Sequence, residues 1–325
     1  MALSDRSELT VGARWYDIEV DFEGSANSSF YNGFGNPDTQ QFGSNLSAQY
    51  APGNANGYPD TAATDGVIGK VSYSWNKNDD VMYYLTWSEG FRPGLLNRPA
   101  GRTSPDGSYS VPPSIDSDEV TNYEFGWKAV AMDGALRFNG SVYMVDVSGL
   151  QSTIFDPSIV NLFFSDNAAD AEIKGVEGDF MYFTGSGLTL SGAFSLLDTE
   201  ITKSLVPTGD VIVGSDLAFA PGFQANFSLR KEWGTSSGNT GHWQAQFNHS
   251  RKSDSDIMEP NRATQASYAL ANIRAGVSND SWTAEMYIDN VTDERAEISN
   301  TFVFDRQRVA VIRPLNLGFR YKVKF

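Results

Sequence analysis

Cysteine is absent from this chain of 325 residues, which excludes disulfide scaffolds, zinc ribbons and thiol catalysis. Basic residues are also scarce: 24 Lys and Arg stand against 40 Asp and Glu, a formal net charge of −16. We therefore expect no nucleic-acid partner, because phosphate binding depends on Lys and Arg.

Long apolar runs are missing as well. No stretch approaches the roughly 18 apolar residues that a membrane-spanning helix needs. If the chain meets a bilayer, it must cross it as a closed barrel of strands. The first residues, MALSDRSELTV, are too polar for a signal peptide, so we expect the natural start to lie further upstream.

Histidine occurs at His242 and His249 alone, close together in one stretch of alternating residues. Their odd separation places them on opposite faces of a strand, where they cannot share a metal ion. Catalysis by a membrane phospholipase or protease would need a nucleophile with an oriented base. We therefore expect neither an enzyme nor a cofactor or metal site.

What the chain does have is a period of two between apolar and polar residues. The end of the chain shows it most clearly, where one strand face carries Leu315, Leu317, Phe319, Tyr321, Val323 and Phe325. The same alternation recurs upstream and predicts about twelve strands. The predicted fold is all-β, an antiparallel up-and-down meander in one domain, 1–325.

The predicted connections alternate strictly between short turns and long loops. The short turns fall near 76–80, 132–134, 184–187, 234–241 and 278–280, and the long loops near 24–65, 92–117, 148–169, 199–216, 253–265 and 293–313. Transmembrane barrels of the outer membrane have short periplasmic turns and long outer loops. A soluble sandwich, propeller or adhesin has no reason to keep this parity.

Several motifs resemble one family. The first ends a strand in Gly90, Phe91, Arg92, Pro93 and Gly94, and the next strand carries Asn122, Tyr123, Glu124, Gly126 and Lys128. Further on come Gly175 with Glu177, Asn290 with Asp293, and the closing YKVKF that ends at Phe325. In this order and spacing they resemble the barrel of TonB-dependent receptors.

The resemblance implies an outer-membrane receptor of a Gram-negative bacterium. It implies uptake of a siderophore, cobalamin, carbohydrate or similar nutrient, with outer-membrane lipid around the barrel and the energy-coupling TonB complex acting through a plug domain. The family's barrel has about 22 strands. We therefore expect the C-terminal part of a barrel, without plug and first strands, which does not carry out coupled transport alone and forms an incompletely closed sheet. The alternative is a complete passive porin-like channel of about 12–14 strands.

Individual site residues follow from the strand faces. Glu124, Lys128, Arg137, Glu177 and Asp179 share the polar face, which a wet lumen would accept and lipid would not. As lumen or substrate candidates we take Arg92, Arg137, Glu177 and Asp179; alternatively they pair with one another or with plug residues. Phe325 fits the aromatic-ended signal for barrel assembly that the resemblance implies, or an ordinary strand end.

Overall fold

The computed structural model describes residues 2–21, 61–97, 101–154, 159, 164–207, 211–254, 263–303 and 306–324. Within these ranges no helix has the length and apolar character needed to span a membrane. Phe325 lies outside the described residues.

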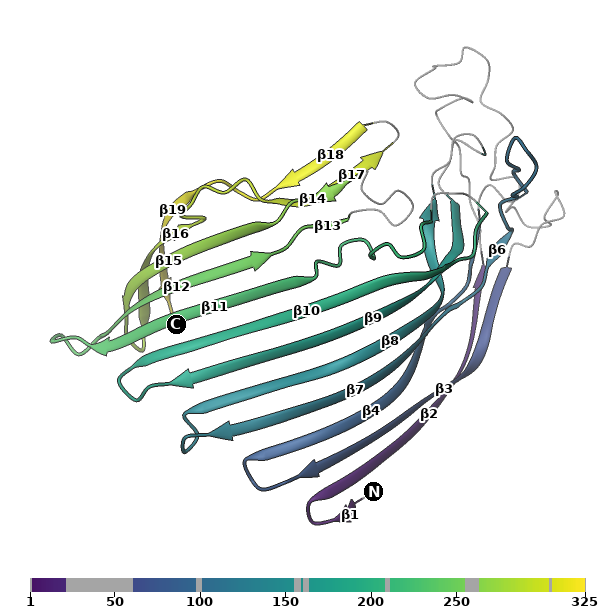
Figure 1. Cartoon of the computed structure of the whole chain (residues 1–325). Coiled ribbons are helices and arrows are strands. Elements are labelled where there is room, and N and C mark those ends of the chain that lie inside the picture. The colour runs from purple at the N-terminus through teal and green to yellow at the C-terminus, as the bar shows by residue number, and fades with distance from the viewer. Residues whose placement is uncertain are drawn as a thin grey trace.

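Thirteen strands form one antiparallel sheet, and each strand pairs with its neighbours along the chain (Figure 1). The strands are β1 Ala2–Ser4, β2 Ser7–Asp21, β3 Thr61–Asn76, β4 Val81–Arg92, β7 Asp118–Ala131, β8 Leu136–Ile154, β9 Phe164–Phe183, β10 Leu188–Ser204, β11 Phe223–Gly234, β12 Thr240–Ser250, β15 Tyr268–Ser278, β16 Trp282–Asp289 and β19 Asn316–Val323. This confirms the predicted meander of about twelve strands.

The sheet is strongly curved, as a section of a barrel wall would be (Figure 1). In the strand order β1 and β19 stand at the two ends, and within the described residues they do not pair with each other. The expected incompletely closed sheet is therefore what the structure shows. Both outer edges carry backbone groups that further strands could pair.

All five predicted short turns lie between consecutive strands, at one end of the sheet. Turn residues include Asp133 and Gly134, both with positive φ, in the connection from β7 to β8. Tight turns need this left-handed conformation, which glycine adopts without strain and Asp tolerates. The short turns are thus a local consequence of the sequence.

The predicted long loops were partly wrong in extent. β8 continues to Ile154 and β9 begins at Phe164, so much of the predicted loop 148–169 is paired strand. β10 likewise runs to Ser204 inside the predicted loop 199–216. In these three strands the ladder hydrogen bonds continue beyond the point where the alternation of apolar and polar residues ends. The alternation alone therefore predicted strands that are too short.

Short hairpins occupy three other predicted loops. They pair β5 Leu95–Leu96 with β6 Ser114–Ile115, β13 Ser253–Asp254 with β14 Thr264–Gln265, and β17 Glu297–Val303 with β18 Arg306–Val311. The predicted long loops 92–117, 253–265 and 293–313 therefore contain short paired segments.

The two faces of the sheet differ as the period of two predicted. On one face, large apolar side chains are open to the surroundings, among them Trp15 at 69% and Phe319 at 66% exposed. Such a band on a transmembrane wall faces lipid. We call this side the outer face, and the opposite side, which carries Glu124 and Glu177, the inner face.

At the loop end of β8–β10 the inner face becomes apolar. Val147 lies opposite Ala171, and Ala171 opposite Ile201, on the same face as Glu177. These side chains are buried together with Val111 from the β4–β7 connection. A small hydrophobic core therefore lies above the polar part of the wall and fixes the connecting loop to the strands.

Candidate functional site

The Gly-Phe-Arg-Pro-Gly corner is held to the next two strands by Arg92. Its backbone amide donates to Asp118 Oδ1 at 3.0 Å and its Nε to Asp118 Oδ2 at 2.7 Å. One terminal nitrogen also donates to the Gln151 carbonyl at 3.2 Å. Asp118 is only 2% exposed, so Arg92 compensates a buried carboxylate. These contacts favour a structural role; substrate contact by Arg92 remains a prediction.

The other residues of the corner have close packing partners. The Phe91 ring stacks on Tyr16, with centroids 3.6 Å apart. The Pro93 carbonyl accepts from Gln151 Nε2 at 2.9 Å. A Cβ at Gly94 would overlap the Ile115 carbonyl oxygen, so glycine is required by close approach of the backbone.

The connection from β4 to β7 is clasped onto β8 and β9. Buried Asn97 donates to the carbonyls of Pro112 at 2.9 Å and Ser165 at 2.7 Å, and accepts from the Ser165 amide at 2.8 Å. Tyr109 donates its hydroxyl to Asp166 at 2.5 Å. The described part of the loop, 93–97 and 101–117, is therefore an ordered rim of the wall. These contacts were not predicted from the sequence, because the partners lie far apart in the chain.

Burial and the neighbouring Asp166 change the chemistry of Tyr109. The side chain is 8% exposed. Burial first, and then the hydrogen bond and the charge of Asp166, raise the pKa of the Tyr109 hydroxyl above its ordinary value of 10.0. The neutral hydroxyl is the form that can donate the hydrogen bond to Asp166.

Three predicted carboxylates come together on the inner face. Glu124 accepts from the Tyr84 hydroxyl at 2.5 Å, and Glu177 from the Ser141 hydroxyl at 3.3 Å. Asp179, one position along β9 on the same face, accepts from Asn139 Nδ2 at 3.1 Å. Each of the three carboxylates therefore accepts a hydrogen bond from an uncharged donor. We call Glu124, Glu177 and Asp179 the inner-face carboxylates.

The predicted cations lie nearer the short turns on this face. Lys128 is opposite Asn139 on β8, and Arg137 is opposite Met181 on β9. Arg92 is at the other end of the wall, where β4 meets its loop. The structure therefore brings the carboxylates together but does not bring Arg92 and Arg137 together. Substrate contact by these residues remains a prediction.

Two motif glycines make room for tyrosine rings. Gly126 lies opposite Tyr84 and Gly175 opposite Tyr143, and a Cβ at either glycine would overlap the ring. The ring lies flat over the neighbouring strand because no side chain stands there. Of the other motif residues on β7, Asn122 shares the inner face, while Tyr123 is on the outer face, where it is 49% exposed.

Asn290 and Asp293 form a turn clasp before the last strand. Asn290 adopts positive φ and its side-chain amide donates to the carbonyls of Glu294 at 2.9 Å and Arg313 at 3.0 Å. Asp293 accepts from the Leu315 amide at 2.9 Å. The clasp joins both ends of the β17–β18 hairpin connection, so these motif residues have structural contacts.

The histidines lie on opposite faces, as predicted. His242, 3% exposed, is on the inner face with Nε2 3.3 Å from Glu285 Oε2. Arg320 Nη1 lies 3.8 Å from the other oxygen of Glu285. His249 instead approaches the Phe223 ring at 5.8 Å. No sequence pattern predicts the His242–Glu285 pair, because the two residues lie two strands apart with Gly276 between them.

The family of this chain follows from the match of its sequence to a family model. A family model described as TonB dependent receptor-like, beta-barrel, matches residues 1–291. The chain belongs to the TonB-dependent receptor family. Barrels of this family are outer-membrane transport receptors of Gram-negative bacteria and not enzymes.

Solved structures with the same fold include three receptors or transporters. The ferric yersiniabactin uptake receptor FyuA from Yersinia pestis is 17% identical, with a TM-score of 0.74, over 99% of this chain and 44% of FyuA. The copper transporter OprC is 14% identical, with a TM-score of 0.71, over 99% and 47%. FpvA from Pseudomonas aeruginosa PAO1, bound to pyoverdine, is 17% identical, with a TM-score of 0.62, over 99% and 40%. The chain spans less than half the length of each.

Proposed function

We propose that this chain forms the C-terminal wall of an outer-membrane receptor that takes up a nutrient, with a ferric siderophore or similar metal chelate as the favoured class. The favoured class rests on the ligands of two receptors with the same fold, ferric yersiniabactin for FyuA and pyoverdine for FpvA. Cobalamin and carbohydrates are the remaining classes that the family resemblance implies. Loops and the adjoining inner face would recognise the ligand.

The observation that carries this proposal is the contrast between the two faces of the wall. The outer face exposes Trp15 and Phe319, which suit lipid, and the inner face holds the inner-face carboxylates with their neutral donors. A polar interior beside an apolar exterior is the arrangement of a transmembrane barrel with a wet lumen. A solute would pass along hydrogen-bonding groups rather than through an apolar gate.

The ordered rim would bind the ligand, whereas energy coupling would depend on another part of the receptor. Asn97 and Tyr109 fix the β4–β7 connection onto the strands, so a ligand would meet a preorganised surface there. Coupling to the TonB complex would require a plug domain of the kind that the family carries beside its barrel. The wall described by this chain would supply the passage and not the coupling.

The test is uptake by cells that lack the gene. We expect deletion to abolish uptake of one radiolabelled ferric chelate, while uptake of cobalamin and sugars is unchanged, and we expect collapse of the proton-motive force to have the same effect. Loss of cobalamin or sugar uptake instead would reassign the substrate class. Uptake that the gene supports equally well without proton-motive force would favour the passive channel and contradict a coupled receptor.

Complementation tests the inner face. We expect Glu124→Gln with Glu177→Gln to lower uptake several-fold at unchanged surface expression, because the polar lining loses two charges. The matched control is Asp133→Asn, which removes a carboxylate from the short β7–β8 turn. Equal uptake in both strains would show that the inner-face carboxylates do not contribute to passage of the ligand.

A further inference from the structure

The dipeptide Asp-Gly occurs three times in the chain, at Asp65–Gly66, Asp106–Gly107 and Asp133–Gly134. In such a pair the glycine nitrogen can attack the side-chain carboxyl carbon of the aspartate, because glycine has no Cβ to obstruct the approach. One water molecule leaves and a five-membered succinimide ring forms. Hydrolysis of the ring takes up one water molecule and gives either aspartate or isoaspartate, whose main chain runs through the side-chain carboxyl carbon. The reaction at each pair therefore depends on how the structure holds the two groups.

Both reacting groups are held at Asp106–Gly107, in the β4–β7 connection. The Asp106 carboxylate accepts from Ser104 Oγ at 2.6 Å and from the Ser108 amide at 3.0 Å. The hydrogen bond from Ser104 first, and then those from Ser108, lower the pKa of the Asp106 carboxyl to about 2. An ionised carboxylate resists attack by an amide nitrogen. The Gly107 amide itself donates to the Ser104 carbonyl at 2.9 Å, so Asp106 should remain aspartate.

The main chain is held at Asp65–Gly66, in the middle of a paired strand. Asp65 lies opposite Asp17 of β2, and Gly66 lies opposite Tyr16. The ladder keeps the backbone extended on β3, which opposes the rotation that closes the ring. The Tyr16 ring also fills the space beside Gly66. This pair should therefore be protected as well.

The β7–β8 turn holds neither reacting group of Asp133–Gly134. Among the described residues, no hydrogen bond or ion pair involves the Asp133 carboxylate or the Gly134 amide, and the turn is closed by the Ala135 amide, which donates to the Met132 carbonyl at 3.1 Å. Asp133 and Gly134 are both exposed. Met132 and Asp133 adopt φ of 55° and 54°, a left-handed conformation that is unfavourable for residues with a Cβ. An additional backbone atom would relax this constraint.

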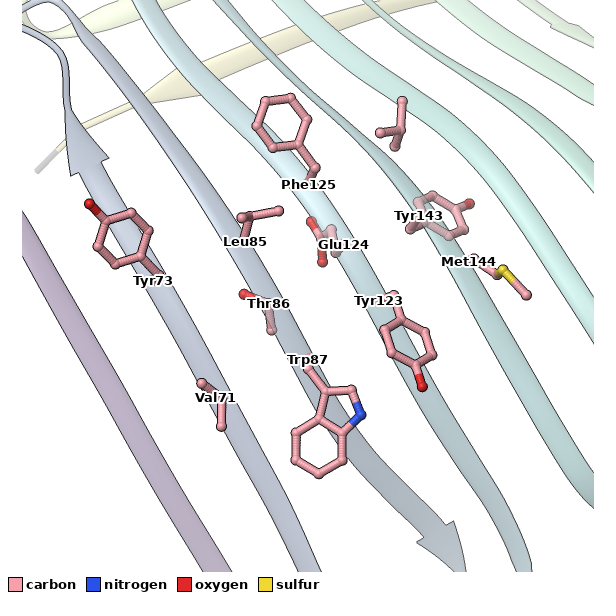
Figure 2. A pocket seen from close by; sticks show the side chains of 11 residues that line it. Val71, Tyr73, Leu85, Thr86, Trp87, Tyr123, Glu124, Phe125, Tyr143 and Met144 are labelled. Atoms are coloured by element: carbon pink, nitrogen blue, oxygen red, sulfur yellow. The ribbon is translucent and has the colours of Figure 1, made fainter.

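We propose that Asp133 is a site of spontaneous isomerisation, at which succinimide formation with Gly134 converts aspartate into isoaspartate as the protein ages. The product adds one carbon to the main chain of the turn. The strands on either side keep their register, because Tyr123 and Phe125 lie on one face of β7 and Glu124 on the other (Figure 2), and a slip by one residue would exchange the lipid and lumen sides. The modified protein therefore stays folded, and its turn records its age.

The experiment ages the full chain in lipid vesicles at neutral pH, in water enriched in heavy oxygen. Each ring that opens takes up one heavy oxygen atom, and peptides with isoaspartate are separated from those with aspartate before mass spectrometry. We expect labelled isoaspartate at position 133 to accumulate several-fold faster than at Asp106 or Asp65, which are controls within the same molecule. Asp133→Glu should abolish the product, because the corresponding six-membered ring forms far more slowly.

A gain of reaction at the protected pair tests the physical cause. Ser104→Ala with Ser108→Ala should raise the rate of isomerisation at Asp106 and leave the rate at Asp133 unchanged. In the urea-unfolded chain the three pairs should react at similar rates, since the fold no longer distinguishes them. Equal rates at Asp133 and Asp106 in the folded chain would overturn the proposal. A difference that persists after unfolding would also overturn it, because local sequence and not the turn would then be the cause.

Discussion

Arg92 and Asp118 face each other across β4 and β7, and one carboxylate binds both the backbone amide and the Nε of the arginine. The arginine of the corner motif is thereby tied to the first residue of the next long strand. The same guanidinium reaches Gln151 on β8. The contact joins three strands where they leave the wall, so it stabilises the base of the loop region.

Asp118→Ala should lower the free energy of unfolding by about 1–3 kcal/mol, because the Arg92 amide and guanidinium lose their buried acceptor. Urea unfolding in lipid vesicles, followed by tryptophan fluorescence, measures the effect. Asp116→Ala is the control, since Asp116 is exposed. Equal unfolding midpoints for the two variants would show that the ion pair does not contribute to stability.

Gly126→Val should destabilise the wall by about 1–3 kcal/mol, because the new side chain overlaps the Tyr84 ring in a packed sheet. Gly12→Val is the control, because nothing lies near the position of a Cβ there. The double variant with Tyr84→Ala should recover part of the loss. Independent, additive effects of the two changes would contradict the packing of the ring over the glycine.

Tyr109 should make the rim sensitive to alkaline pH. The pKa of its hydroxyl is raised in the folded protein above the ordinary 10.0. The hydrogen bond from Tyr109 to Asp166 therefore stabilises the rim fully below about pH 10, and this stabilisation is lost as the pH rises through the pKa of the folded protein. At pH 8, subtilisin should cleave the β4–β7 connection several-fold more slowly in the unchanged protein than in Tyr109→Phe. The difference in cleavage rate between the two proteins should become smaller above pH 10. A difference in rate that is constant from pH 8 to 11 would show that ionisation of Tyr109 does not control the stability of the rim.

The chain alone should give no steady single-channel conductance in planar bilayers. Among the described residues β1 and β19 leave both edges of the sheet unpaired, so no closed pore is defined. Uniform conductance steps from the purified chain would favour the small passive channel instead.

Local patterns account for most of what the sequence predicted correctly. The alternation of Tyr123 and Glu124 along β7 follows from the strand period, and the turn at Asp133 follows from residues that tolerate positive φ. Membrane constraints strengthen both patterns, since lipid and lumen demand opposite side chains.

Contacts between distant residues explain what the sequence could not predict. Asn97 bonds to Ser165 and Tyr109 to Asp166, far apart in the chain, and nothing in a loop rich in Gly, Ser and Pro marks these partners. Arg92 illustrates the same limit. Its polar position suggested the lumen, whereas Asp118, which occupies its guanidinium, becomes a neighbour only after β4 and β7 pair.

The assignment of the two faces is the central claim, and spin labelling of β7 tests it most directly. Because the chain has no cysteine, single substitutions at Tyr123, Glu124, Phe125, Trp127 and Lys128 give uniquely labelled proteins in lipid vesicles. Labels at 123, 125 and 127 should be relaxed mainly by oxygen dissolved in lipid, and labels at 124 and 128 mainly by a water-soluble nickel chelate. Relaxation without this alternation, or with the chelate reaching every position, would contradict a wall between lipid and a wet lumen.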